Sequence, residues 1–223
     1  SADHRGLFAP LAIPFALWQG QSQVEMTIGS VQLNDFAVDN VYSNVFGNNS
    51  VLRLTSLNAD LFGGQINATG RLDMRSAIPE FELQNSLTDI DLELALPAIA
   101  DNSDLSGLLS LEVEMQGSGN SSEEIISALS GTGDLTVLNP TYLAINAEET
   151  FCNAVTLFGG SPTNTVWSKG TELETLTSQF SLENGKVLIR DLKTATGNLS
   201  ISGRGTVQLL LKRYSVTANT RVN

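Results

Sequence analysis

The sequence predicts a mainly β fold, in which a long antiparallel meander of strands is accompanied by two to four short helices. Two observations support this prediction. Apolar and polar residues alternate with a period of two along most of the 223-residue chain, as they do in strands that bury one face. Turn signals such as Asn184-Gly185 and Gly197-Asn198 separate the alternating runs, so we expect successive strands to pair as hairpins.

The alternating runs begin near residue 24 and define the expected strands. In "VEMTIGSVQL" the apolar phase shifts by one residue at Gly29, which indicates a β-bulge that keeps one face apolar. The stretch "LNADLFGGQINATGRLD" is typical of a strand, a tight turn at Gly63-Gly64 and a second strand. Further runs occupy residues 66–74, 90–96, 109–115, 135–137, 180–182, 187–189, 199–201, 207–211 and 214–216. We therefore expect about a dozen strands in one meander.

Helix signals are few. In "SSEEIISALSG" Ser121 and Glu124 form a capping box, and Gly131 is expected to stop the helix. In "NAEETFCNAVTLFGG" Asn146 is the expected N-cap, and apolar residues follow at helical spacing up to Gly159. Shorter helical turns are expected at residues 97–101 and within the proline-interrupted apolar segment 7–18.

Composition excludes several classes of function. The net charge of −12 and the pI near 4.4 oppose binding to phosphate backbones, so no nucleic-acid partner is expected. A single cysteine, Cys152, and a single histidine, His4, exclude an internal disulfide, a zinc cluster and a histidine-dependent catalytic triad. The apolar run Leu7–Trp18 is too short to span a membrane, which takes about 20 residues. We expect no metal and no cofactor.

The acidic residues offer a candidate site that has a simpler explanation. Asp89, Asp91 and Glu93 are expected to project from one strand face, where they could bind Ca²⁺ or form an acid pair. Glu112 and Glu114 repeat the pattern on another strand, which favours a solvated polar face. No other motif indicates catalysis, so the chain is predicted not to be an enzyme.

The apolar faces of so many strands need a cover, and the few helices are too short to supply it. Three arrangements satisfy this need: two sheets packed as a sandwich, a closed barrel, or a curved sheet that folds over something apolar. Composition does not separate them.

Several segments, in their order along the chain, resemble the AsmA family, and specifically its C-terminal region. The proline-bearing opening segment leads through Gly20 into the first paired strands. The segments that follow are "ADLFGGQINATGRLD", "SGLLSLEVEMQGSG", "LSGTGDLTVLNPTYLAIN" and "FSLENGKVLIRDLKTATGNLSISGRGTVQL". The resemblance covers Leu7 to Val216 and rests on this order, because each piece alone is low in complexity.

The resemblance implies a fold and a location. AsmA-like proteins are Gram-negative, inner-membrane-anchored proteins with most of their mass in the periplasm, and their β-rich bodies resemble bridge-like lipid-transfer proteins. It implies a strongly curved sheet, a groove or half-barrel, in a single domain over residues 1–223. Residues 1–6 are expected to be disordered or foreign to the natural chain, and the membrane anchor is expected to lie outside this sequence.

The function that follows is a non-enzymatic, periplasmic role in outer-membrane lipid homeostasis and assembly. The expected partners are phospholipid or another acyl-chain lipid, the remainder of the full-length chain, and envelope assembly proteins. The candidate lipid-facing residues are Leu92, Leu94, Leu111, Val113, Leu135, Val137, Ile189, Ile201 and Leu209. The alternatives are a protein-interaction scaffold with a filled core and a glycan-binding or glycan-cleaving β-domain; the low aromatic content gives the last little support.

Overall fold

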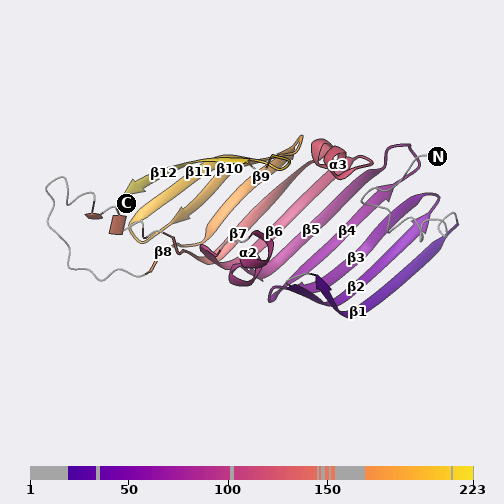
Figure 1. The fold of residues 1–223 in the computed structure, drawn as a ribbon, viewed down its shortest axis with the longest axis horizontal. Coiled ribbons are helices and arrows are strands. Elements are labelled where there is room, and N and C mark those ends of the chain that lie inside the picture. The colour runs from indigo at the N-terminus through magenta and orange to yellow at the C-terminus, as the bar shows by residue number, and fades with distance from the viewer. Residues whose placement is uncertain are drawn as a thin grey trace.

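The computed structural model describes residues 20–33, 36–100, 103–144, 146, 149–150, 152–153, 169–211 and 213–222. These residues form one antiparallel sheet of twelve strands, in the order β1-β2-β3-β4-β5-β6-β7-β9-β10-β11-β12, with β8 paired to β7 (Figure 1). Within them β1 pairs only with β2 and β12 only with β11, so the sheet has two open edges. The predicted antiparallel meander is confirmed, and it is not closed into a barrel.

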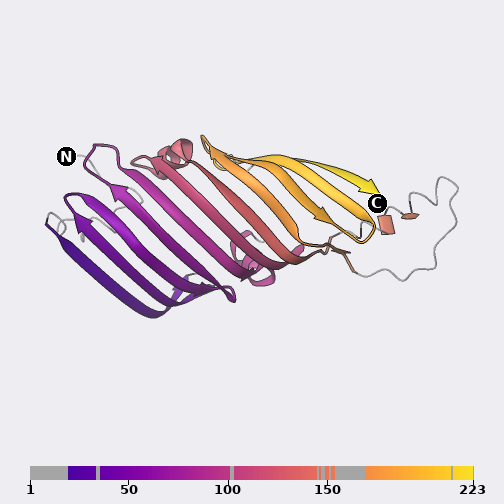
Figure 2. The same ribbon diagram turned by 180° about the vertical axis from the view of Figure 1, so that it is seen from behind.

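The strands and helices follow one another closely. The strands are β1 (Ser22–Leu33), β2 (Phe36–Asn48), β3 (Val51–Leu61), β4 (Gly64–Asp73), β5 (Glu80–Asp91), β6 (Leu105–Ser118), β7 (Ser130–Tyr142), β8 (Thr171–Glu172), β9 (Leu176–Glu183), β10 (Lys186–Ala195), β11 (Leu199–Gln208) and β12 (Arg213–Val222). The helices are α2 (Leu92–Ala100) and α3 (Ser122–Ala128). The helices lie at opposite strand ends of a single layer of strands, as the view from behind also shows (Figure 2).

Tight turns connect the strands where the sequence predicted them. The β3–β4 turn consists of Phe62 and Gly63, with φ angles of 48° and 77°, and both angles are positive as in a type I′ turn. Gly64 is already the first residue of β4. A β-carbon there would lie 2.6 Å from the Asp89 carbonyl oxygen, so the close approach of the β5 backbone requires glycine. Asn184-Gly185 forms the same kind of turn between β9 and β10.

The phase shift at Gly29 is also confirmed. Against β3 the register of β2 shifts by one residue between Asp39 and Tyr42, so Val38 and Val41 project to the same side. Their partners on β1, Val31 and Ile28, therefore share that side too. The apolar side of β1 therefore continues after the shift.

The alternating run over residues 90–96 was predicted as a strand, and that prediction is wrong beyond Asp91. Helix α2 begins at Leu92, because the carboxylate of Asp91 accepts a hydrogen bond from the Glu93 amide at 2.8 Å and caps the first turn. Leucine, alanine and glutamate are strong helix formers, and Leu92 and Ala95, three residues apart, are both buried. Asp89, Asp91 and Glu93 consequently do not share one strand face.

The predicted helix after Ser121 is confirmed as α3. Ser121 accepts the Glu124 amide at 3.3 Å, and the Glu124 carboxylate accepts the Asn120 amide at 2.7 Å. The helix ends at Ala128 rather than near Gly131, which belongs to β7 instead.

The predicted cap at Asn146 is present, since its side chain accepts the Glu149 amide at 2.9 Å. The rest of that predicted helix, apart from Thr150, Cys152 and Asn153, lies outside the described residues. The segment 7–18 lies outside them as well.

Candidate functional site

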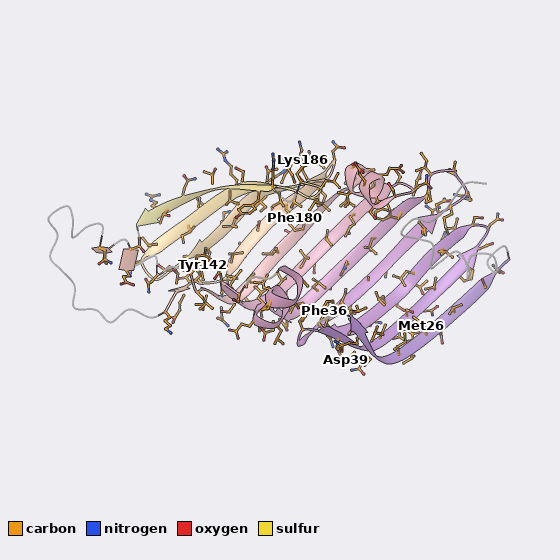
Figure 3. The ribbon with its side chains drawn as sticks, in the orientation of Figure 1. Met26, Phe36, Asp39, Tyr142, Phe180 and Lys186 are labelled. Atoms are coloured by element: carbon orange, nitrogen blue, oxygen red, sulfur yellow. The ribbon has the colours of Figure 1, made fainter. Side chains whose placement is uncertain are left out.

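Residues paired across an antiparallel sheet project to the same face, so the register defines rows that cross the strands. One row crosses eleven strands without interruption. Its members, from β1 to β12, are Met26, Ser43, Leu57, Ala68, Asn85, Val113, Gly133, Phe180, Ile189, Gly205 and Val216. We call it the central row. Figure 3 labels two of its members, Met26 on β1 and Phe180 on β9, which lie several strands apart.

Two flanking rows on the same face are also dominated by apolar residues. The first crosses the whole sheet and consists of Val24, Val45, Leu54, Gly70, Leu83, Met115, Gly131, Leu182, Val187, Val207 and Tyr214. The second runs from β3 to β9 and consists of Ala59, Ile66, Leu87, Leu111, Leu135 and Ser178. Together with the central row they form what we call the apolar face.

Large side chains fill the space above the glycines of this face. The ring of Phe180 occupies the position where a β-carbon of Gly133 would lie. The Leu83 side chain approaches within 3.2 Å of the corresponding position at Gly70. Gly70 and Gly133 therefore make room for a neighbour's side chain, as in sheets where an aromatic residue covers a glycine on the adjacent strand, whereas Gly131 is closest to the backbone of β6.

The helices leave most of the apolar face uncovered. Helix α2 contacts β5 and β6, and α3 contacts β6. In the interior, Val113 is only 8% exposed. At the edges Met26 is 44% exposed and Tyr214 is 81% exposed, since neither edge strand has an outer neighbour among the described residues. The described part of the chain contains no second layer of strands over this face.

Four of the nine candidate lipid-facing residues belong to these rows, and Val137 and Ile201 lie on the same side of the sheet outside them. Val113 and Ile189 belong to the central row, and Leu111 pairs with Leu135 in a flanking row. Val137 pairs with Leu109 and Leu176 farther along the strands. Ile201 lies on β11 opposite Thr194 and Thr220.

Three candidates lie elsewhere. Leu92 and Leu94 were predicted on a strand but belong to α2, where Leu92 is buried and Leu94 is 54% exposed. Leu209 follows the end of β11, and its amide bonds to the Gly185 carbonyl at 3.0 Å.

Sequence reasoning missed three polar members of the apolar face, Ser43, Asn85 and Ser178. They interrupt rows of mostly apolar residues, and the alternation of their strands is the signal that could have identified them. The Asn85 Oδ1 and Ser178 Oγ atoms are buried and accept no hydrogen bond within the described part of the chain. Such groups destabilise an apolar surface unless a partner satisfies them.

The opposite face is polar and carries an open depression of about 420 Å³ across β3–β7. Each of the five strands contributes three successive residues, of which the two outer ones project to the polar face. Glu112, Glu114 and Asp134 line it; Gln84 donates to Glu114 at 3.3 Å and Gln179 donates to Asp134 at 2.8 Å. Among the described residues no group of three or more His, Cys, Asp or Glu could hold a metal ion.

One ion-pair cluster stands at the end of β4. The carboxylate of Asp73 accepts hydrogen bonds from Arg71 Nη2 at 2.6 Å and from Arg75 Nε at 2.9 Å, and Arg75 Nη2 contacts it as well. The bonds from Arg75 hold the pKa of Asp73 well below its usual range, and the carboxylate raises the pKa of Arg75 in turn. The side chain of Asp73 is only 11% exposed.

No helix among the described residues is long and apolar enough to cross a membrane. Comparison with known proteins matches residues 9–192 to the sequence model of the AsmA family. Protein AsmA of Escherichia coli (strain K12) is 24% identical over 160 residues, which cover 71% of this chain and 26% of that relative. The chain thus spans about a quarter of the length of the curated relative, and no solved structure matches it significantly.

The match assigns residues 9–192 to the family as a whole, so the predicted correspondence to its C-terminal region stays a prediction. The range covers well over half of the 223 residues. The chain belongs to the AsmA family.

Proposed function

We propose that this chain is a non-enzymatic, lipid-handling domain of the Gram-negative cell envelope, which holds or guides phospholipid acyl chains along its apolar face. Membership of the AsmA family supports an envelope-related function. The proposal includes a periplasmic location and attachment to the inner membrane through a segment outside this sequence.

One observation carries the proposal: apolar rows cross the sheet from β1 to β12, with no second layer among the described residues. Soluble monomers rarely expose a contiguous apolar patch larger than a few hundred Å². Interior residues of the face such as Val113 and Leu182 are buried among their neighbours, while edge residues such as Met26 are exposed. A continuous apolar face without a covering layer among the described residues favours an apolar partner, and long acyl chains match its continuity.

The energetics fit a surface that binds an acyl chain firmly and still lets the chain slide along it. Each CH₂ group that leaves water contributes about 0.8 kcal/mol, so a chain lying on Leu111 and Leu135 would be held firmly. Because the rows continue from strand to strand, a chain that slides along them exchanges one apolar contact for another. Two unsatisfied polar atoms suit the polar groups of a lipid: the Ser178 hydroxyl can donate to an ester oxygen, and the Asn85 carbonyl oxygen can accept from a hydroxyl group.

Adjacent residues on the two faces provide a matched test. A photocrosslinking amino acid is placed at Leu111 on the apolar face or at Glu112, its neighbour on the polar face. The chain is then purified from a Gram-negative host, irradiated and examined by mass spectrometry. We expect phospholipid adducts at position 111 and none at position 112. Reproducible absence of both co-purified lipid and adducts at position 111 would falsify the proposal.

A second candidate is a scaffold for the assembly of outer-membrane proteins. The open edges favour it, because the unpaired backbone groups of β1 and β12 are suited to pairing with a strand of another protein. Photocrosslinkers at Met26 or Tyr214 would then yield protein adducts, while position 111 would yield no lipid adduct.

A further inference from the structure

Three arginines surround one depression on the polar face, where β3 begins and β4 ends. The depression measures about 350 Å³, and its lining includes Arg53, Arg71 and Arg75 together with Phe46, Asn48, Asn49 and Val51. The whole chain has only 12 lysine and arginine residues against 24 acidic ones. Three of these 12 cationic residues, a quarter of them, line this one depression.

The register places two of these charges directly opposite each other. Arg53 on β3 pairs with Arg71 on β4, an arrangement of like charges that destabilises a sheet. Asp73 compensates Arg71 and Arg75, and Glu82 lies 4.0 Å from Arg71 Nη1. Arg53 forms no hydrogen bond or ion pair with any residue that the structure describes. Its five N–H donors are therefore available.

The local backbone holds Arg75 in place. Asn49 and Ser50 form the β2–β3 turn with φ angles of 53° and 63°. The Ser50 carbonyl accepts the Met74 amide at 2.9 Å, which brings the chain after β4 alongside that turn. The Arg75 amide also donates to Asp73 at 3.1 Å. Arg75 is thus positioned before any ligand arrives, which lowers the entropic cost of binding.

We propose that this depression binds a phosphate-type oxyanion, with Arg53 as its principal ligand and Arg71 and Arg75 at its sides. The guanidinium group presents paired N–H donors that match two oxygens of a phosphate, and such charge-assisted bonds are about twice as strong as neutral ones. Asp73, Glu80 and Glu82 lower the net charge around the site. These three carboxylates offset the three arginine charges, so Arg53, which has no ion pair among the described residues, supplies the attraction for a single phosphate group, and the site does not suit a polyanion such as a nucleic acid.

A second depression extends the site along the strands. It measures about 450 Å³, shares Arg53 and Arg71 with the first, and continues past Thr69 and Gln84. It offers room for a polar group attached to the phosphate. The phosphate could belong to a lipid head group or to a free phosphate compound. The site lies on the polar face, so the proposal does not depend on acyl chains binding to the apolar face.

Calorimetric titration of the 223-residue chain at low salt tests the site with three probes. They are inorganic phosphate, dihexanoyl phosphatidic acid below its micellar concentration, and dihexanoyl phosphatidylcholine as the zwitterionic comparison. We expect saturable binding of the first two. Arg53→Gln should weaken that binding about tenfold, the loss expected for one charge-assisted pair. Arg204→Gln is the matched control, since Arg204 is an exposed arginine of β11 on the same face.

The outcomes are distinct. Tighter binding of the phosphatidic acid than of inorganic phosphate assigns the site to a lipid head group, and equal binding assigns it to free phosphate compounds; both support the proposal. The absence of saturable binding overturns it, as does an equal loss in Arg53→Gln and Arg204→Gln. Urea unfolding of both variants checks that the fold is kept. Lipid adducts at position 111 should be unchanged in Arg53→Gln, so failure of this site leaves the acyl-chain proposal standing.

Discussion

The ring of Phe81 on β5 occupies the space above Gly117 on β6, with its Cε1 atom 2.8 Å from the position that a Gly117 β-carbon would take. Phe180 stands in the same relation to Gly133, but there the Glu112 carbonyl oxygen also lies 2.7 Å from that position. A phenyl ring can turn aside, whereas a backbone carbonyl within a sheet cannot. The two glycines should therefore tolerate a methyl group differently.

Gly133→Ala is expected to destabilise the chain by about 1–3 kcal/mol, the usual cost of overpacking. Gly117→Ala should cost less, because only the end of the Phe81 ring must move. Gly29→Ala is the control, since nothing lies within 4 Å of its β-carbon position. Urea unfolding followed by circular dichroism measures all three. Equal losses in the three variants would contradict the explanation.

Asn85→Leu should stabilise the isolated chain by about 1 kcal/mol. The substitution removes a buried carbonyl oxygen that has no partner among the described residues and continues the apolar central row. Asn67→Leu, on the polar face of the adjacent strand, is the control and should not stabilise. Unfolding in urea provides the measurement; a loss of stability in Asn85→Leu would show that the oxygen has a partner.

Asp73→Asn should destabilise the folded chain at neutral pH, and this destabilisation should decrease in acid. The folded pKa of Asp73 lies below the unfolded value of about 3.9, so its stabilising contribution is complete above that value. As the pH falls through the folded pKa the carboxylate is protonated and the contribution disappears. Urea unfolding midpoints are measured at pH 7, 5 and 3. The difference in midpoint between Asp73→Asn and the parent chain should be equal at pH 7 and 5 and smaller at pH 3. Glu112→Gln, which removes an exposed carboxylate without an ion pair among the described residues, is the control.

Gly185→Ala should cost about 1 kcal/mol, because the β9–β10 turn holds this residue at a φ angle of 72°. Gly197→Ala, in the next hairpin turn, should cost less, since Gly197 has no positive φ angle and no atom within 4 Å of its β-carbon position. Thermal unfolding of the two variants side by side distinguishes them. A larger effect at Gly197 would contradict the turn assignment.

Most strands could be predicted from the sequence, because period-two alternation and turn residues such as Asn184-Gly185 are local signals. It was insufficient for α2, where "LELALPAIA" alternates like a strand and is also rich in helix formers. The hydrogen bond that Asp91 accepts from Glu93 favours the helix over the strand. An aspartate is identified as a helix cap only when a helix is expected to follow it, and the alternation of this segment predicted a strand.

The arginine site lay beyond sequence reasoning for a different reason. Arg53 and Arg71 are eighteen residues apart, and they meet only because the β3–β4 turn and a bulge between Leu54 and Leu57 set the register. A shift of one residue would send one of them to the apolar face. The apolar face was predicted from alternation, but its lack of a covering layer depends on how the strands associate, which alternation alone does not determine.

The order of the strands has a consequence for how such a molecule grows. Apart from the step from β7 to β9, every neighbour in the sheet is also the next strand in the chain. Stability is then close to a sum of contributions from successive hairpins and their interfaces, as in a linear array. Inserting or removing one hairpin would change the length of the sheet by two strands and leave the register of the rest intact. Gene duplication can therefore lengthen a sheet of this architecture by one hairpin at a time.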